Sequence, residues 1–145
     1  MGLFGRKKYG SVDAVGHTTI RVAEPEGCET IIDLASLQWL SFLQVGDEST
    51  NVYEGWWLLG WRNVGIAVLI ECGAIDPLLR DGMFADSIQQ VTDKSLIFTS
   101  TRPTVLSGHA AKHGIVHLSA DEAARLRNMG THESASSVDD FPKIL

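Results

Sequence analysis

The chain has 145 residues, of which 44% are hydrophobic and 21% are charged, and its formal net charge is -6 at pH 7. This length and composition fit one soluble domain that can bury roughly two thirds of its unfolded surface. The acidic charge is concentrated, because no Lys or Arg lies between Arg21 and Arg62 while seven acidic residues do. Such a field repels phosphate, so the composition argues against nucleic-acid binding through the main body.

The cysteines and the N-terminus bear on where the protein acts. Cys28 and Cys72 match neither a C-x-x-C redox pair nor a zinc-binding spacing, which indicates reduced thiols in a cytosolic protein. Residues 1–8, M-G-L-F-G-R-K-K, lack the apolar run of a secretory signal, and Arg6 stands where a myristoylation motif requires Ser or Thr. We therefore expect a cytoplasmic location rather than secretion, with residues 1–10 forming a flexible basic tail.

Residues 11–130 are predicted to form a single α+β domain with a partly antiparallel sheet and three or four helices. Its first element is a strand over residues 17–23, where apolar and polar side chains alternate with the period of a half-buried strand. Residues 24–27, E-P-E-G, then end this strand as a turn.

The next segment has the signals of a helix. Thr30 with Asp33 three positions later resembles a capping pair, and a broad stripe of apolar side chains follows. Residues 30–44 are therefore predicted to form a helix that Gly46 stops.

The most distinctive segment is residues 52–70, an almost wholly apolar run that holds three of the four tryptophans: Trp56, Trp57 and Trp61. As one helix this run would contain three glycines, each costing about 1 kcal/mol relative to alanine. The β-branched and aromatic content favours a hairpin of strands 56–61 and 66–71, with a turn between them. A helix that starts at Ser49 stays open as the alternative.

Charges within the same run argue against a membrane span. Arg62 would lie near the bilayer centre, at about 2.5–3.5 kcal/mol on insertion scales, and Glu54 would also be inside. The tryptophans are instead expected to serve as core or as a contact with a partner, and an exposed pair would need a partner to cover it.

The second half of the domain contains further recognisable elements. Asp76-Pro77 is expected to open a helix that Phe84, Ile88 and Val91 continue, and strands are expected over residues 95–100 and 114–118. The best-specified element is a helix over residues 120–129. Its start is a capping box formed by Ser119 and Glu122, and Gly130 supplies its C-terminal stop.

Residues 131–145 form an acidic, serine-rich tail with an apolar C-terminal end. Such a segment buries too little surface to fold alone, so it is expected to be either a disordered tail or a short docking peptide. In the second case its apolar side chains would enter a groove on a partner or on another copy. These candidate partner-binding residues are Phe141, Ile144 and Leu145, together with the three tryptophans above.

A cluster of histidines is the only candidate for metal chemistry. His109, His113 and His117 recur every four residues, and on one helix they would present three imidazoles able to bind zinc. The glycines at 108 and 114 and the strand-like context of His117 argue against that helix, so surface and strand-edge histidines are the main interpretation. A small metal-binding hydrolase or sensor that uses these three residues is kept as an alternative.

Other catalytic motifs are missing from the sequence. It contains no G-x-S-x-G elbow, no G-x-x-x-x-G-K-[ST] phosphate loop and no G-x-G-x-x-G between a strand and a helix. We therefore expect no catalytic residues and no cofactor.

Residues 114–130, G-I-V-H-L-S-A-D-E-A-A-R-L-R-N-M-G, carry a strand followed by Leu-Ser, x-x-Glu-Ala, Leu and Gly. This segment resembles a pattern common in small structural proteins of tailed bacteriophages. The resemblance covers seventeen residues near one end and implies a small module that assembles with other copies or with other virion proteins. The protein would then be located in the virion if it is phage-encoded.

Together these observations predict a non-enzymatic interaction or assembly protein, either a virion component of the head-tail or tail region or a mobile-element component. It is expected to act as a homo-oligomer or as part of a larger assembly. A second alternative is a membrane-surface protein held by Leu3 and Phe4 with the basic residues 6–8.

Overall fold

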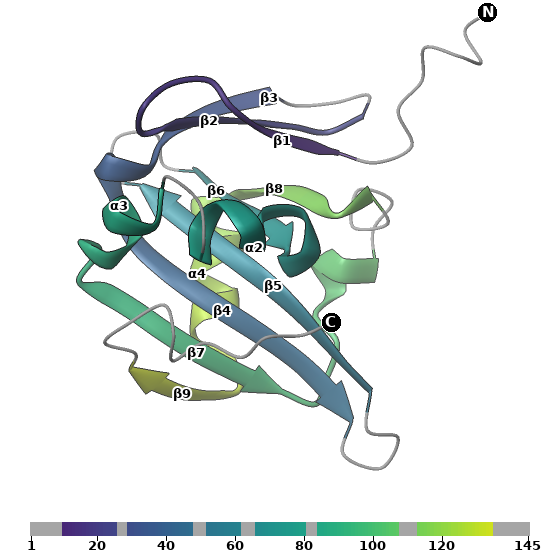
Figure 1. Cartoon of the computed structure of the whole chain (residues 1–145). Coiled ribbons are helices and arrows are strands. Elements are labelled where there is room, and N and C mark those ends of the chain that lie inside the picture. Colours follow the sequence, from purple (N-terminus) through teal and green to yellow (C-terminus); the bar gives the residue numbers. More distant parts are fainter. Residues whose placement is uncertain are drawn as a thin grey trace, which may run out of the picture.

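The larger of two sheets has six strands in the order β8-β6-β5-β4-β7-β9 (Figure 1). The structure is a computed structural model, and it describes residues 10–25, 29–47, 52–61, 66–80, 84–107 and 113–134. The strands of this sheet are β4 (Leu37–Asp47), β5 (Val52–Trp61), β6 (Ile66–Glu71), β7 (Asp93–Thr99), β8 (Ile115–Ser119) and β9 (Thr131–Ser134). All neighbours are antiparallel except β4 and β7, which are parallel.

The smaller sheet is an antiparallel meander of β1 (Ser11–Ala14), β2 (Thr19–Ala23) and β3 (Glu29–Asp33). It lies over one end of the large sheet, and Figure 1 shows it at the top. Its inner face carries Ile20, Val22 and Ile32, all buried, whereas Ile31 on the outer face is exposed. The short 3-10 helix η1 (Leu34–Ser36) then leads into β4.

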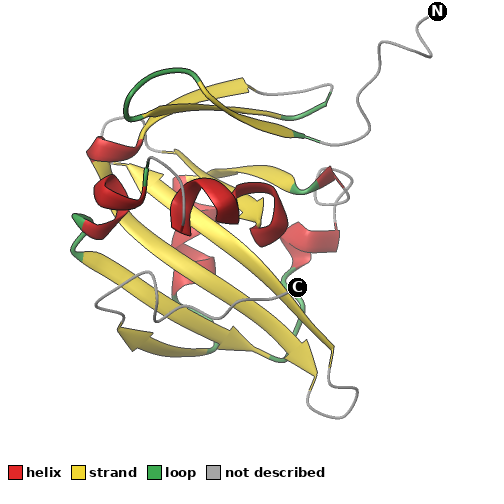
Figure 2. Cartoon of the chain, viewed as in Figure 1, coloured by secondary structure: helices red, strands yellow, loops and turns green. Residues whose placement is uncertain are grey.

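Helical segments cover both faces of the large sheet (Figure 2). The helices α2 (Cys72–Arg80) and α3 (Ala85–Gln89) lie on the face that the small sheet also covers. On the opposite face lie α4 (Ala120–Arg127) and the 3-10 helix η2 (Thr104–Ser107). The described residues therefore form two hydrophobic cores, one on each side of a central sheet that is apolar on both faces.

The tryptophan run forms the centre of this sheet, and the predicted hairpin is confirmed. In β5, Trp57 and Leu59 contribute to one core while Trp56 and Leu58 contribute to the other. This alternation is what a strand with two buried faces requires. Trp57 also packs edge-to-face against Phe42 of β4, with ring centroids 5.0 Å apart and an interplanar angle of 83°.

Other local predictions are also confirmed. The strands expected over residues 17–23, 95–100 and 114–118 are β2, β7 and β8. The capping box is present in both directions: the Glu122 N–H donates to Ser119 Oγ, and the Ser119 N–H donates to the Glu122 carboxylate. Gly130 has a φ of +67°, the left-handed conformation that glycine favours after a helix.

The predicted fold class, an α+β domain with three or four helices, is wrong. The protein is mostly β, with about half of it in strands arranged in two sheets, and its helices are short.

The helix expected over residues 30–44 is one source of that error, because this segment is β3, η1 and the first part of β4. Asp33 does act as a cap, since its Oδ1 accepts the Ala35 N–H at 3.0 Å, but it caps only the single turn of η1. The apolar stripe that follows is a strand buried on both faces. Phe42 belongs to one core and Leu43 to the other.

The helix expected to open at Asp76-Pro77 differs in its bounds. Helix α2 already begins at Cys72 and ends at Arg80, and α3 is a separate short helix. Phe84, Ile88 and Val91 nevertheless all enter the core, as their spacing indicated.

Lys94 of β7 is 5% exposed and stabilises the end of α3. Its ammonium donates to the Gln89 carbonyl at 3.0 Å and also to the Val91 carbonyl. Burial lowers the pKa of this lysine, because removal of water disfavours the charged form.

The first four residues of the acidic tail form β9, which pairs with the outer edge of β7. Residues 135–145 lie outside the described part of the structure.

Candidate functional site

Two of the three candidate contact residues of the tryptophan run, Trp56 and Trp57, are core residues. Trp56 is 2% exposed and Trp57 is 0% exposed. The side chain of Trp61 and the residues Phe141, Ile144 and Leu145 lie outside what the structure describes. The two described indoles are therefore covered within one chain and do not form a surface for a partner.

The histidine stripe is not brought together in the described part of the chain. His117 lies in the middle of β8, His113 precedes that strand, and His109 is outside the described residues. Among the described residues, no group of three or more His, Cys, Asp or Glu side chains lies close enough to hold a metal ion.

His117 instead joins the two sheets. Its Nδ1 lies 2.5 Å from Glu24 Oε2, and its Nε2 lies 2.7 Å from Thr30 Oγ1. The side chains of His117 and Glu24 are only 11% and 16% exposed. A neutral imidazole that donates from Nδ1 and accepts the threonine hydroxyl proton at Nε2 satisfies all three groups.

We interpret this carboxylate–imidazole–hydroxyl chain as a clamp between the sheets. Thr30 and Glu24 precede His117 by 87 and 93 residues, so no local pattern in the sequence could have shown that they meet it. Both ring nitrogens of His117 are engaged, which leaves neither of them available as a metal ligand in this arrangement.

A groove on the other face of the large sheet is the more suitable binding site. It has a volume of about 430 Å³ and lies between the segment after β7 and helix α4. Its lining residues are Thr101, Arg102, Pro103, Thr104, Val105, Glu122, Arg125, Leu126 and Met129. This volume falls in the range of sites that bury a small ligand or a few side chains.

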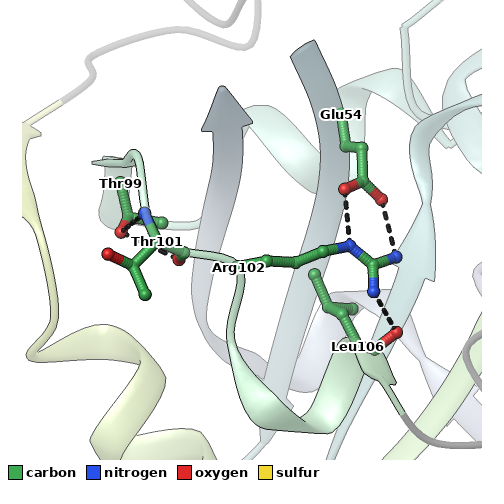
Figure 3. A network of polar contacts seen from close by, with 5 residues as sticks. All are labelled: Glu54, Thr99, Thr101, Arg102 and Leu106. Carbon is green, nitrogen blue, oxygen red and sulfur yellow. Dashed lines mark hydrogen bonds and ion pairs between the residues drawn. The ribbon is translucent and has the colours of Figure 1, made fainter. Parts of the chain in front are cut away.

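One wall of the groove is held by Arg102 (Figure 3). Its Nε and Nη2 donate to the two carboxylate oxygens of Glu54 on β5, at 2.8 and 3.1 Å, and its Nη1 donates to the Leu106 carbonyl at 2.5 Å. Hydrogen bonds from this guanidinium are the main reason why the pKa of Glu54 is lowered. A turn in which Thr99 Oγ1 accepts the Thr101 N–H at 3.1 Å completes the wall.

The other wall is α4, which is fixed at both ends. At its start, the capping hydrogen bonds with Ser119 lower the pKa of Glu122, with the backbone N–H as the largest cause. At its end, Arg127 donates to Asp93 at 2.9 Å and to Ser41 at 3.3 Å. The Arg127 guanidinium carbon also lies 4.2 Å from the centroid of the Trp39 ring, a cation–π contact.

The groove combines an apolar floor with a charged rim that holds Arg102, Arg125 and Glu122. Pro103 and Leu126 are buried, and Val105 and Met129 are half-buried. Arg102 is bound by Glu54 in an ion pair, whereas Arg125 is exposed and has only an electrostatic interaction with the nearby Glu122. Arg125 is therefore the arginine of the rim that can receive an incoming carboxylate. The arrangement suits an apolar side chain that has acidic neighbours.

No protein-family model, curated protein or solved structure matches this chain. The resemblance of residues 114–130 to phage structural proteins therefore stays a prediction. None of the described helices has the length and apolar character needed to cross a membrane.

Proposed function

We propose that this protein is a non-enzymatic interaction and assembly protein, of the kind that virions or mobile elements contain, and that it binds its partner in the groove beside α4. The observation that carries the proposal is the groove itself, whose apolar floor and arginine rim lie between two firmly held walls. Firmly held walls lower the ordering cost of binding, because little of the site must be immobilised when the partner arrives.

The chemistry of the lining favours recognition over reaction. Among the described residues that line the groove none is a histidine, cysteine or lysine, and the one carboxylate, that of Glu122, is held by the cap of α4. Its polar groups are two threonine hydroxyls, two guanidinium groups and a carboxylate that already caps α4. Such a surface selects a peptide by shape and charge.

The partner that fits is an extended protein segment with an apolar anchor next to one or more carboxylates. Met129 is an adaptable contact for an apolar or aromatic side chain, because its thioether is flexible and polarisable. Arg125 would add a charge-assisted hydrogen bond to the neighbouring acid.

The test is the oligomeric state measured by light scattering coupled to size exclusion. We expect the chain to associate as its concentration rises and the Arg125→Glu variant to associate at least ten-fold more weakly. Ala124→Glu is the matched control, since Ala124 is exposed on the same helix but does not line the groove. A strict monomer at high concentration, or equal weakening by both variants, would contradict the proposal.

A further inference from the structure

The C-terminal segment has the composition that the groove requires. Residues 135–145 read A-S-S-V-D-D-F-P-K-I-L, so Asp139 and Asp140 directly precede the aromatic Phe141. Pro142 disfavours a helical conformation for Phe141 and so favours an extended chain at this point. The sequence thus places two carboxylates directly before an aromatic anchor.

We propose that the groove beside α4 binds residues 139–141 of a second copy of this chain. The inference rests on the proposed assembly function and names its partner. Phe141 would enter the apolar floor between Pro103, Leu126 and Met129, and the preceding carboxylates would lie at Arg125. Aromatic rings and methionine sulfur make favourable contacts, which gives the floor a preference for phenylalanine over an aliphatic side chain.

The path of the described chain favours binding of the C-terminal segment in the groove of a second copy over binding in its own groove. Strand β9 is antiparallel to β7, with Thr131 opposite Phe98 and Ser134 opposite Ser95. The groove wall follows the end of β7, so the chain runs away from its own groove as it passes from Thr131 to Ser134. A return to that groove would have to reverse over the length of β9, about 13 Å at 3.3 Å per residue, which would use most of the roughly 20 Å that residues 135–140 can span.

The linker is long enough to reach another molecule. The six residues 135–140 can span at most roughly 20 Å when extended, a reach sufficient to take Phe141 beyond the edge strand β9. Because the arm and the groove are different surfaces, two copies can exchange arms in a closed two-fold dimer, or each copy can pass its arm to the next one. Repetition of such a contact produces a ring or an open filament, which is the behaviour expected of an assembly protein.

The decisive experiment uses two full-length variants that are defective in opposite halves of the contact. Phe141→Asp removes the anchor of the arm, and Arg125→Glu reverses the charge at the groove. We expect the unmodified chain to form concentration-dependent oligomers and each variant alone to be a monomer. A mixture of the two variants should form a 1:1 dimer, because one supplies an intact arm and the other an intact groove.

A peptide of residues 135–145 gives an independent readout by fluorescence anisotropy. It should bind the Phe141→Asp chain saturably, bind the Arg125→Glu chain at least ten-fold more weakly, and lose at least ten-fold in affinity when it carries Phe141→Ala itself. Thr104→Asp, an exposed position on the opposite wall, should also weaken binding, whereas Ala124→Glu should leave it unchanged. Near-ultraviolet circular dichroism verifies that each variant is folded.

Three results would overturn the inference, and the second of them leaves the proposed function standing. A monomeric unmodified chain whose Phe141→Asp variant binds the peptide would place the arm in its own groove. Association that survives Phe141→Asp but is lost in Arg125→Glu would leave the groove as the assembly site with a different occupant. Absence of both association and peptide binding would overturn the inference and the proposed function together.

Discussion

The indole of Trp39 on β4 occupies the space that a side chain at position 60 on β5 would need. The two residues are partners across the strands, and a Cβ at Gly60 would lie 2.1 Å from Cε2 and Cζ2 of the Trp39 ring. An aromatic ring that covers a glycine on a neighbouring strand is a recurrent way to stabilise a sheet at that point. The same ring also makes a cation–π contact with Arg127 of α4. The absence of a side chain at Gly60 therefore lets Trp39 link β5 to that helix.

Gly60→Ala is therefore expected to destabilise the protein by about 1–3 kcal/mol, because the ring must move in a closely packed region. The free energy of unfolding in urea measures this effect. Gly73→Ala is the control, since nothing lies within 4 Å of a Cβ at that helical position and no positive φ is involved. That change should stabilise the chain by about 0.5–1 kcal/mol, and a loss of stability in both variants would contradict the argument.

Glu54→Gln tests the ion pair that holds the groove wall. The Arg102 and Glu54 side chains are 46% and 35% exposed, so solvent screens the pair and we expect a loss of only about 0.5–1 kcal/mol at pH 7. The pKa of Glu54 is lowered in the folded protein, so its contribution is present above the unfolded pKa of about 4.3. The difference between the two proteins should therefore shrink as the pH falls through the acidic range. A difference that stays constant down to pH 2 would show that the carboxylate charge is not responsible.

The clamp between the sheets can be measured with a double-mutant cycle. Thr30→Val and Glu24→Leu each remove one hydrogen-bond partner of His117, and each is expected to cost about 1 kcal/mol of unfolding free energy. The effects should be non-additive by at least about 0.5 kcal/mol, because both hydrogen bonds depend on the position of one imidazole. Amide hydrogen exchange should become faster in β3, where Thr30 lies. Additive effects would mean that the two contacts act independently.

Lys94 gives a prediction at alkaline pH. In the folded protein, burial lowers the pKa of Lys94 below its ordinary value of 10.5. At a pH between the folded and the unfolded pKa, the unfolded chain therefore binds more protons than the folded one. Stability supplied by this site should therefore increase as the pH rises through that window. The Lys94→Met variant should lack this increase, which urea unfolding of both proteins at pH 8 and pH 10 would reveal. Identical pH dependence in the two proteins would refute the assignment.

Local signals in the sequence were sufficient wherever neighbouring residues alone decide the structure. The capping box of Ser119 and Glu122 works within four residues, and the glycines of the tryptophan run make a helix costly, so α4 and the β5–β6 hairpin were both predicted correctly. The alternation in β2 was likewise readable, because only one of its faces contributes to the core.

The tertiary structure alone decided the state of residues 37–44. Their apolar side chains fit a helix stripe and a doubly buried strand equally well, and only pairing with β5 and β7 selects the strand. Periodicity cannot distinguish these cases, because a strand with two buried faces has no polar side to mark it.

The candidate site depended in the same way on contacts between distant parts of the chain. Sequence alone nominated Phe141, Ile144 and Leu145 as candidate docking residues, a prediction that no described residue tests. The groove, in contrast, is formed only when Arg102 meets Glu54, 48 residues away, and when α4 packs beside that loop. Sequence also nominated Trp56 and Trp57 as a contact surface, and burial in two separate cores removed them from that role. Composition determines which side chains can bind a partner, whereas packing decides which of them remain exposed to do so.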